Sequence, residues 1–130
     1  MIFILEDNYD RIENFRIALG AIENHTERTV PDAINWLSSN VNSGILFSLD
    51  NDLYVPEFEG DEGEGWQLCE WILSNSRKCP LIIHTTNFTA AAKMETACTD
   101  AGWNFMRIIP YNGFDWIHQS WIKAVREMIG

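Results

Sequence analysis

Short apolar runs alternate with amphipathic stretches along the whole chain, and this alternation constrains the fold more than any other feature. A short apolar run suits a strand buried on both faces, and an amphipathic stretch suits a helix that covers a sheet. Strands are predicted over residues 2–5, 27–30, 45–49, 81–83 and 105–109. Because strands separated by helices lie parallel in one sheet, the sequence predicts an α/β fold.

The amphipathic stretches predict five helices, one after each strand. They cover residues 9–19, 31–40, 66–73, 89–101 and 116–129. The last of them carries an apolar stripe at helical spacing, formed by Ile117, Trp121, Val125 and Met128. Helices on both faces of a five-stranded parallel sheet make a doubly wound fold, and by analogy with such folds we expect the strand order 2-1-3-4-5.

Length and charge limit the domain organisation and the partners. The 130 residues suit a single domain over residues 1–130, and 46% hydrophobic residues supply enough apolar side chains for its core. A formal net charge of −10 repels the backbone of a nucleic acid. Direct binding to a long nucleic acid is therefore not expected.

Cysteine usage and hydropathy indicate the compartment. The three cysteines form no CxxC pair, and an odd number does not pair completely within one chain. The sequence begins with a strand-like run instead of a basic signal peptide, and no apolar stretch approaches the roughly 20 residues that span a bilayer. We therefore expect a cytoplasmic protein that does not contact a membrane.

Acidic and polar residues directly follow three of the predicted strands. Residues 6–7 follow the first strand, residues 50–52 the third and residues 84–87 the fourth. Ligands of open α/β sheets bind outside the carboxyl ends of the strands, at the point where the strand order reverses. Carboxylates held together there repel each other unless a cation binds or a carboxyl takes up a proton.

These acids predict a site for Mg²⁺ or Mn²⁺, because hard divalent cations prefer carboxylate oxygens. We expect Asp7 and Asp50 to be direct ligands and Glu6 to bind directly or through a water molecule. The alternative is that each acid merely ends a strand or caps a helix, which is a common use of Asp. That alternative does not explain why the acids share one edge of the sheet.

The residues around these acids suit phosphate chemistry. A carboxylate at a metal site can attack phosphorus, and Asp50 is the candidate nucleophile because it directly follows the buried strand. Thr85 and Thr86 offer hydroxyl groups to phosphate oxygens, and ordinary strand threonines are the alternative. His84 interrupts an apolar strand, so it is either a structural group beside the core or a catalytic acid or base.

The same residues resemble those of response-regulator receiver domains over nearly the whole chain. Residues 5–7 are similar to the acidic pair after the first strand of receivers, residues 49–50 to the phosphoacceptor segment, and residues 80–85 to the strand that ends in the switch hydroxyl. The resemblance implies a flavodoxin-like receiver fold. Receivers carry a lysine directly before a proline after the fifth strand, whereas Ile109 precedes Pro110 here. An ordinary phosphorylation switch would therefore lack its usual stabiliser of the phosphoryl group.

Two motifs resemble a divergent branch, the cyclic-phosphate processing receiver domains. Residues 48–53 are similar to its third-strand signature, with Asn51 where that branch typically has His. Residues 83–87 are similar to its fourth-strand motif, although Phe88 replaces an expected proline. The resemblance implies a general acid or base at His84 and metal ligands at Asp50 and Asp52. The candidate phosphate-binding side chains are Thr85, Thr86 and Asn87.

Two functions remain open from the sequence. The first is an enzyme that processes cyclic phosphates or other phosphoesters with a divalent metal, acting on a small phosphorylated ligand or on a phosphate end. The second is a degenerate receiver that acts as a phospho-signalling or protein-interaction module. Trp116 and Trp121 on the last helix are candidates for a surface that contacts a protein partner or a second copy in a homodimer.

Overall fold

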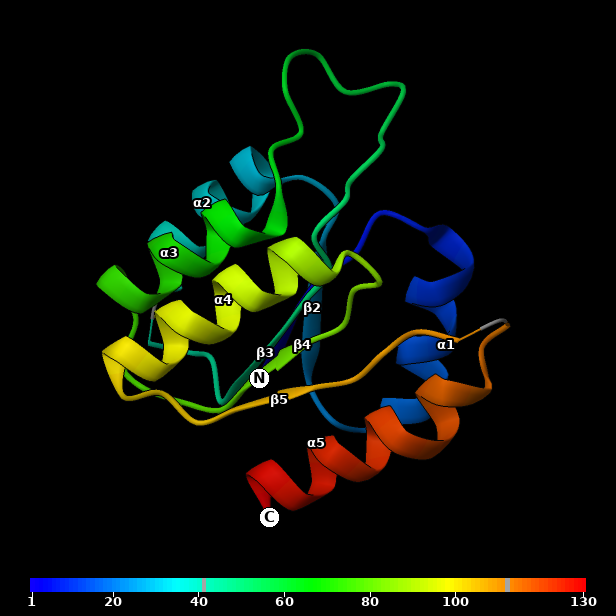
Figure 1. Cartoon of the computed structure of the whole chain (residues 1–130). Helices are drawn as coiled ribbons and strands as arrows, with labels where there is room; N and C mark the ends of the chain where they lie inside the picture. Colours follow the sequence, from blue (N-terminus) through cyan, green and yellow to red (C-terminus); the bar gives the residue numbers. More distant parts are fainter. Residues whose placement is uncertain (41, 112) are drawn as a thin grey trace.

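The computed structural model describes residues 1–40, 42–111 and 113–130. Within these residues the centre is a parallel sheet of five strands in the order β2-β1-β3-β4-β5 (Figure 1). The strands are β1 (Ile2–Leu5), β2 (Asn24–Glu27), β3 (Leu46–Leu49), β4 (Leu81–Ile83) and β5 (Phe105–Arg107). The strand order reverses between β1 and β3, which are direct neighbours. The predicted fold class and strand order are confirmed.

Helices cover both faces of the sheet (Figure 1). They are α1 (Tyr9–Leu19), α2 (Val30–Ser38), α3 (Gly65–Asn75), α4 (Phe88–Ala101) and α5 (Ile122–Ile129), with a π-helical turn, η1 (Ile117–Trp121), before α5. α2, α3 and α4 lie on one face, and α1 and α5 lie on the other. This division agrees with right-handed crossovers on both sides of the switch point in a doubly wound sheet.

Alternate residues of the central strands build two separate cores. Phe3 and Leu5 belong to the core under α2, α3 and α4, whereas Ile2 and Ile4 belong to the core under α1 and α5. All four side chains are fully buried. The alternation follows from the two-residue period of a strand, and the run is apolar throughout because helices cover both faces.

The second strand begins earlier than the sequence predicted. β2 covers Asn24–Glu27 instead of residues 27–30, and it pairs in register with Ile2–Leu5 of β1. Thr29 then caps α2, because its hydroxyl accepts a hydrogen bond from the Asp32 amide (3.2 Å). This edge strand has the polar sequence NHTE, so no apolar run marks its position.

The last helix contains a π-helical turn, and its tryptophans face inward. The sequence predicted one helix over residues 116–129, and these residues are helical, with the π-helical turn η1 leading directly into α5. Trp121 is fully buried and Trp116 is 3% exposed, and both rings contact Phe15 of α1. The prediction that these two tryptophans contribute to a partner or dimer surface is therefore wrong, because the core covers them.

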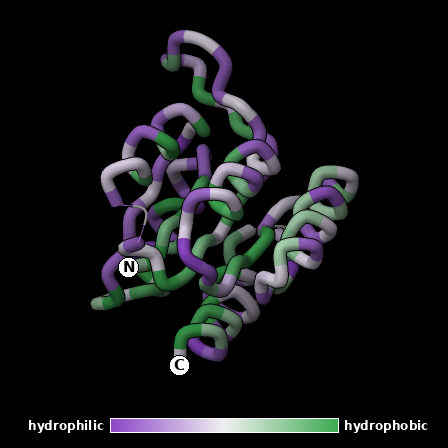
Figure 2. The backbone as a smooth tube through the Cα atoms, turned by 90° about the vertical axis from the view of Figure 1, so that its left-hand side faces the viewer, coloured by the Kyte–Doolittle hydropathy of each residue, from purple (hydrophilic) through white to green (hydrophobic). Residues whose placement is uncertain are grey.

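A long hydrophilic loop joins β3 to α3 and projects from the carboxyl edge of the sheet (Figures 1 and 2). Two hydrogen bonds from its own backbone hold it in place. The Tyr54 amide donates to the Asp7 carboxylate (2.8 Å), and the Val55 amide donates to the Glu62 carboxylate (3.0 Å). The loop is thus attached to one of the acids that follow β1.

The three cysteines are free thiols in the structure. Cys69 and Cys98 are buried free thiols, and Cys79 is a half-buried one. Burial raises the pKa of the Cys79 thiol to about 11, which makes it a poor nucleophile at neutral pH. In the part of the chain that the structure describes, the helices are too short or too polar to cross a bilayer.

Candidate functional site

Three carboxylates meet at the carboxyl edge of the sheet. Glu6 and Asp7 follow β1, and Asp50 follows β3. Leu5 and Leu49, the last residues of these strands, are paired in the parallel register, so the following residues emerge side by side. One oxygen from each of the three carboxylates lies within 4.8 Å of the other two. We call Glu6, Asp7 and Asp50 the acidic centre.

Backbone amides hold the carboxylates of the acidic centre. Glu6 accepts hydrogen bonds from the amides of Asp7 and Asn8 (3.1 and 3.2 Å), and Asp50 Oδ1 accepts one from the Asn51 amide (2.7 Å). Glu6 is fully buried, Asp50 is 6% exposed and Asp7 is half-buried. Asp50 Oδ2 accepts no hydrogen bond from the described residues, so this oxygen remains available to a ligand.

Burial makes the charged forms of the Glu6 and Asp50 carboxyl groups energetically unfavourable. Burial raises the pKa of Glu6 to about 7, and burial together with the negative charge of Glu6 raises the pKa of Asp50 to about 7. Burial lowers the pKa of His84 to about 4, so its ring is neutral at pH 7. Without a cation, the carboxyl groups of Glu6 and Asp50 therefore retain protons close to neutral pH.

These pKa values predict that the metal-free protein loses stability as the pH rises from about 4.5 to about 7. Glu6 and Asp50 release protons near pH 4 when unfolded but near pH 7 when folded, while His84, with its lowered pKa, opposes them. The two carboxyl groups and the one imidazole act in opposite directions, so the folded state holds about one more proton than the unfolded state in this pH range. The free energy of unfolding should therefore be roughly 2 to 3 kcal/mol lower at pH 7.5 than at pH 5.

Urea unfolding with a chelator at the two pH values measures this difference. Added Mg²⁺ should restore stability at pH 7.5, because a bound cation replaces the protons. If the metal-free protein is as stable at pH 7.5 as at pH 5, or more stable, the proposed grouping of buried carboxyl groups is contradicted.

Arg11 brings a positive charge to the acidic centre. It projects from the first turns of α1, and its Nη1 lies 3.6 Å from Glu6 Oε1 and 4.0 Å from Asp50 Oδ2. Its guanidinium also lies 5.6 Å from the centre of the Trp116 ring. Sequence analysis did not single out Arg11, although its position one turn after an acidic pair at a strand end could have indicated the contact.

His84 lies beneath the acidic centre and is fully buried. Its Nε2 lies 3.2 Å from Glu6 Oε1, and its Nδ1 lies 2.7 Å from Ser48 Oγ. The Trp121 indole N–H donates to the same Ser48 oxygen (2.9 Å), which leaves the Ser48 hydroxyl hydrogen to point at Nδ1. We therefore assign the proton of the neutral ring to Nε2, which donates to Glu6. Ser48 was not predicted, although a serine inside a buried apolar strand is an unusual residue.

The structure does not group the Asp52 carboxylate with the three of the acidic centre. Its carboxylate accepts hydrogen bonds from the side-chain amides of Asn51 (3.1 Å) and Asn87 (3.2 Å), and its side chain is exposed. Asn87 in turn caps α4, because its Oδ1 accepts from the Ala90 amide (3.0 Å). Asp52 is thus not among the described residues that group within 4.8 Å as metal ligands.

The two threonines after β4 differ in their surroundings. Thr85 is 1% exposed, and its hydroxyl oxygen accepts a hydrogen bond from the Asn87 amide (3.1 Å). Thr86 is exposed at the same edge of the sheet. Thr86 is therefore open to a ligand in this structure, whereas the Thr85 oxygen takes part in a turn.

The donor set of the acidic centre fits a hard divalent cation. Mg²⁺ and Mn²⁺ prefer oxygen ligands, and Mg²⁺ usually keeps several waters besides one or two carboxylates. Two of the three carboxyls have raised pKa values because of burial and mutual repulsion. A charge of +2 among them would relieve that repulsion as the protons leave.

A family model matches most of the chain. The family is described as the cyclic-phosphate processing receiver domain, and the match covers residues 2–100. This stretch includes the acidic centre, the β3 motif and the β4 motif. A search of curated protein sequences finds no match.

Solved structures share the fold at low sequence identity. A BeF3-activated DrrB receiver domain is 17% identical with a TM-score of 0.69, and the match covers 98% of this chain and 95% of that chain. A signal receiver domain of an HD-domain protein from Pseudomonas fluorescens Pf-5 is 17% identical with a TM-score of 0.72, covering 98% and 92%. The Mn²⁺-bound form of response regulator Rcp1 is 15% identical with a TM-score of 0.71, covering 97% and 91%. At such identities the likeness shows the fold alone.

Proposed function

The chain belongs to the family of cyclic-phosphate processing receiver domains, and on that basis we propose that it opens cyclic phosphate esters at the acidic centre with bound Mg²⁺ or Mn²⁺. The observation that carries the proposal is the grouping of Glu6, Asp7 and Asp50 within 4.8 Å, with two of the carboxyls buried. A solved structure with a similar fold is described as the Mn²⁺-bound form of response regulator Rcp1, and this description supports the proposal of a divalent cation.

Glu6, Asp7 and Asp50 are the residues that would hold the cation. When bound, it would polarise the phosphoryl group and neutralise charge that develops during the reaction. We place Asp52 outside the direct ligands, because its carboxylate is hydrogen-bonded to two side-chain amides. In this proposal Asp52 and Asn87 hold the loops after β3 and β4 together.

Opening of a cyclic phosphate adds water to phosphorus. One ester P–O bond of the ring breaks, the released oxygen takes up a proton, and the product is a phosphomonoester. Asp50 Oδ2 is the carboxylate oxygen free to take the proton of the attacking water. Arg11 supplies a positive charge for a phosphoryl oxygen, which compensates for Ile109 at the position where receivers have lysine.

His84 acts through Glu6 in this proposal. Both of its ring nitrogens have internal partners and its side chain is fully buried, so it orients the Glu6 carboxylate instead of touching substrate. The exposed hydroxyl of Thr86 is a donor for a phosphate oxygen, and the Thr85 hydroxyl hydrogen is a second one.

Incubation with 2′,3′-cyclic AMP and Mg²⁺, followed by ³¹P NMR, tests the function. We expect adenosine monophosphate to form, and we expect EDTA or Asp7→Asn to stop its formation. Asp100→Asn, at an exposed position near the end of α4, is the matched control and should retain activity. If folded, magnesium-saturated protein opens no cyclic phosphate, the enzymatic proposal is wrong.

The second candidate is a phospho-signalling or protein-interaction module. It is favoured by the likeness to a receiver domain described as BeF3-activated, and it is disfavoured by Ile109 in place of lysine. Trapping of beryllofluoride beside Asp50 without any turnover of cyclic phosphates would support this second function.

A further inference from the structure

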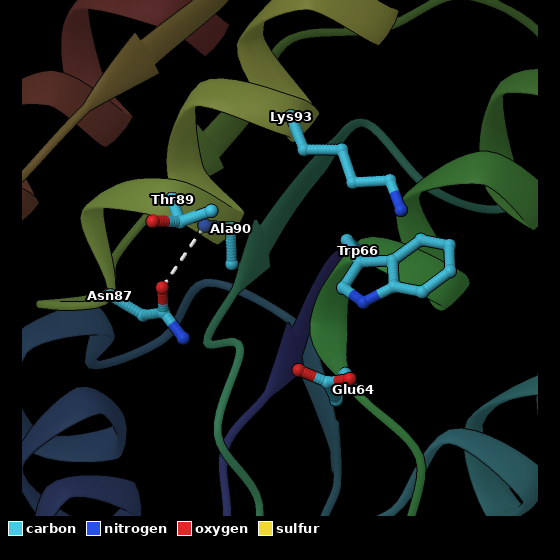
Figure 3. Close-up of a pocket in the computed structure, with 6 residues that line it drawn as sticks. All are labelled: Glu64, Trp66, Asn87, Thr89, Ala90 and Lys93. Atoms are coloured by element: carbon cyan, nitrogen blue, oxygen red, sulfur yellow. Dashed lines mark hydrogen bonds between the residues drawn. The ribbon is translucent and has the colours of Figure 1, made fainter.

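A hollow of about 250 Å³ lies between the first turns of α3 and α4 (Figure 3). It is lined by Glu64, Trp66, Asn87, Thr89, Ala90 and Lys93. The proposed chemistry at the acidic centre uses none of these side chains directly. Its volume is below the about 300 to 1,000 Å³ of pockets that hold a whole drug-sized ligand, so it suits a single ring system.

Asn51 connects this hollow to the acidic centre. Its backbone amide donates to Asp50 Oδ1, and its side-chain amide donates to Glu64 Oε1 (3.3 Å). Its side-chain oxygen accepts from the Trp66 amide (3.1 Å). One fully buried side chain therefore links a residue of the acidic centre to two residues that line the hollow. This link is the reason for considering one small ligand with a phosphate at one end and a ring at the other.

The indole of Trp66 offers a flat face in the hollow. The Lys93 ammonium lies 3.2 Å from the centre of the Trp66 ring, at about the height at which a stacked ring would lie (Figure 3). Lys93 is an exposed, flexible side chain, and a cation–π contact at an exposed site is weaker than stacking of a base on an aromatic ring. A planar ligand can therefore displace the ammonium from this face.

The charges around the hollow select a neutral ring instead of a second phosphate. Glu64 lies at one end of it, and the carboxylate of Asp52 is hydrogen-bonded to Asn87 on its wall. These two negative charges repel an anion, while Lys93 supplies one balancing positive charge. Carboxylate, hydroxyl and ammonium groups together match the donors and acceptors on the edge of a nucleobase.

We propose that this hollow binds the nucleobase of a nucleoside 2′,3′-cyclic phosphate whose phosphate lies at the acidic centre. The assignment rests on the proposed function, and it names the substrate class as mononucleotides or a terminal nucleotide. Stacking on Trp66 supplies most of the preference for a base. The net charge of −10 agrees with a single nucleotide and disfavours a longer strand.

The test compares two cyclic phosphates in the presence of Mg²⁺: 2′,3′-cyclic AMP and glycerol 1,2-cyclic phosphate, which has no base. We expect KM for the nucleotide to be at least about tenfold lower, as stacking of one base predicts. Trp66→Leu should remove this difference and leave the reaction of the glycerol compound unchanged, and Trp66→Phe should keep most of it. Trp71→Leu, a half-buried tryptophan of the same helix that does not line the hollow, is the matched control.

Equal KM values for the two compounds, or no effect of a folded Trp66→Leu protein, would overturn the nucleobase site while leaving the enzymatic proposal intact. If neither compound reacts, the enzymatic proposal fails and binding of adenosine to the unmodified protein decides the inference. Nuclear Overhauser contacts between adenine protons and the Trp66 indole would then support the site, and their absence at saturating adenosine would overturn it.

Discussion

Replacement of Asp50 by Asn is expected to abolish magnesium binding and to stabilise the metal-free protein. The amide has nearly the same shape and can still accept the hydrogen bond from the Asn51 amide. It lacks the charge that a cation needs, so affinity for Mg²⁺ should fall by more than the about 10- to 100-fold that follows loss of an outer-shell partner. It also removes the cost of burying the Asp50 charge and the repulsion of that charge with Glu6, so stability at pH 7.5 should rise by about 1 to 2 kcal/mol.

Calorimetric titration with Mg²⁺ and urea unfolding in EDTA measure the two effects of Asp50→Asn. Asp100→Asn makes the same chemical change at an exposed position of α4 and should alter neither quantity. A loss of binding together with a gain in stability is the signature of a charge kept for function at a cost to the fold. Unchanged magnesium affinity in Asp50→Asn would show that Asp50 is not a ligand.

Replacement of Gly65 by Ala is expected to damage both the fold and the acidic centre. A Cβ atom at Gly65 would lie 1.8 Å from the backbone oxygen of Asp50 and 2.8 Å from Asn51 Cα. Backbone atoms cannot yield as a flexible side chain does, so α3 and the segment after β3 must separate. We expect a loss of about 3 kcal/mol, at the upper end of overpacking costs, and a large loss of magnesium affinity.

Gly60→Ala, in the loop that precedes Gly65, is the matched control. Gly60 has a positive φ of 104°, but a Cβ atom there would meet nothing within 4 Å outside the adjoining residues, so the cost should be limited to backbone strain of about 1 to 3 kcal/mol. Magnesium binding should remain normal in Gly60→Ala. Urea unfolding and calorimetry measure both variants, and a Gly65→Ala protein with unchanged magnesium affinity would show that the close contact does not position Asp50.

The order of elements could be predicted because β1, β3 and β4 are largely apolar runs that are directly followed by polar residues. In a parallel sheet all carboxyl ends lie at one edge, so the positions of Glu6, Asp7 and Asp50 in the sequence were sufficient to bring them together. The position of β2 could not be predicted in the same way. It is an edge strand whose side chains are only half-buried, and its polar sequence gives no period.

Contacts between distant side chains could not be predicted from the sequence. The hydrogen bonds from Trp121 to Ser48 and between Ser48 and His84 depend on how the π-helical turn before α5 packs against the sheet. The contact of Gly65 with Asp50 depends on the path of a long loop. Asp52 illustrates the same limit, because it is two residues from Asp50 yet its carboxylate belongs to a different hydrogen-bond network.

Titration of the ¹⁵N-labelled protein with Mg²⁺ at pH 7.5, followed by NMR, tests most directly whether the acidic centre binds a cation. We predict one saturable site, with the largest shifts at the amides of Asn8 and Asn51, which donate to the carboxylates of Glu6 and Asp50. Shifts that do not saturate, or that are confined to the acidic loop over residues 57–64, would contradict the account.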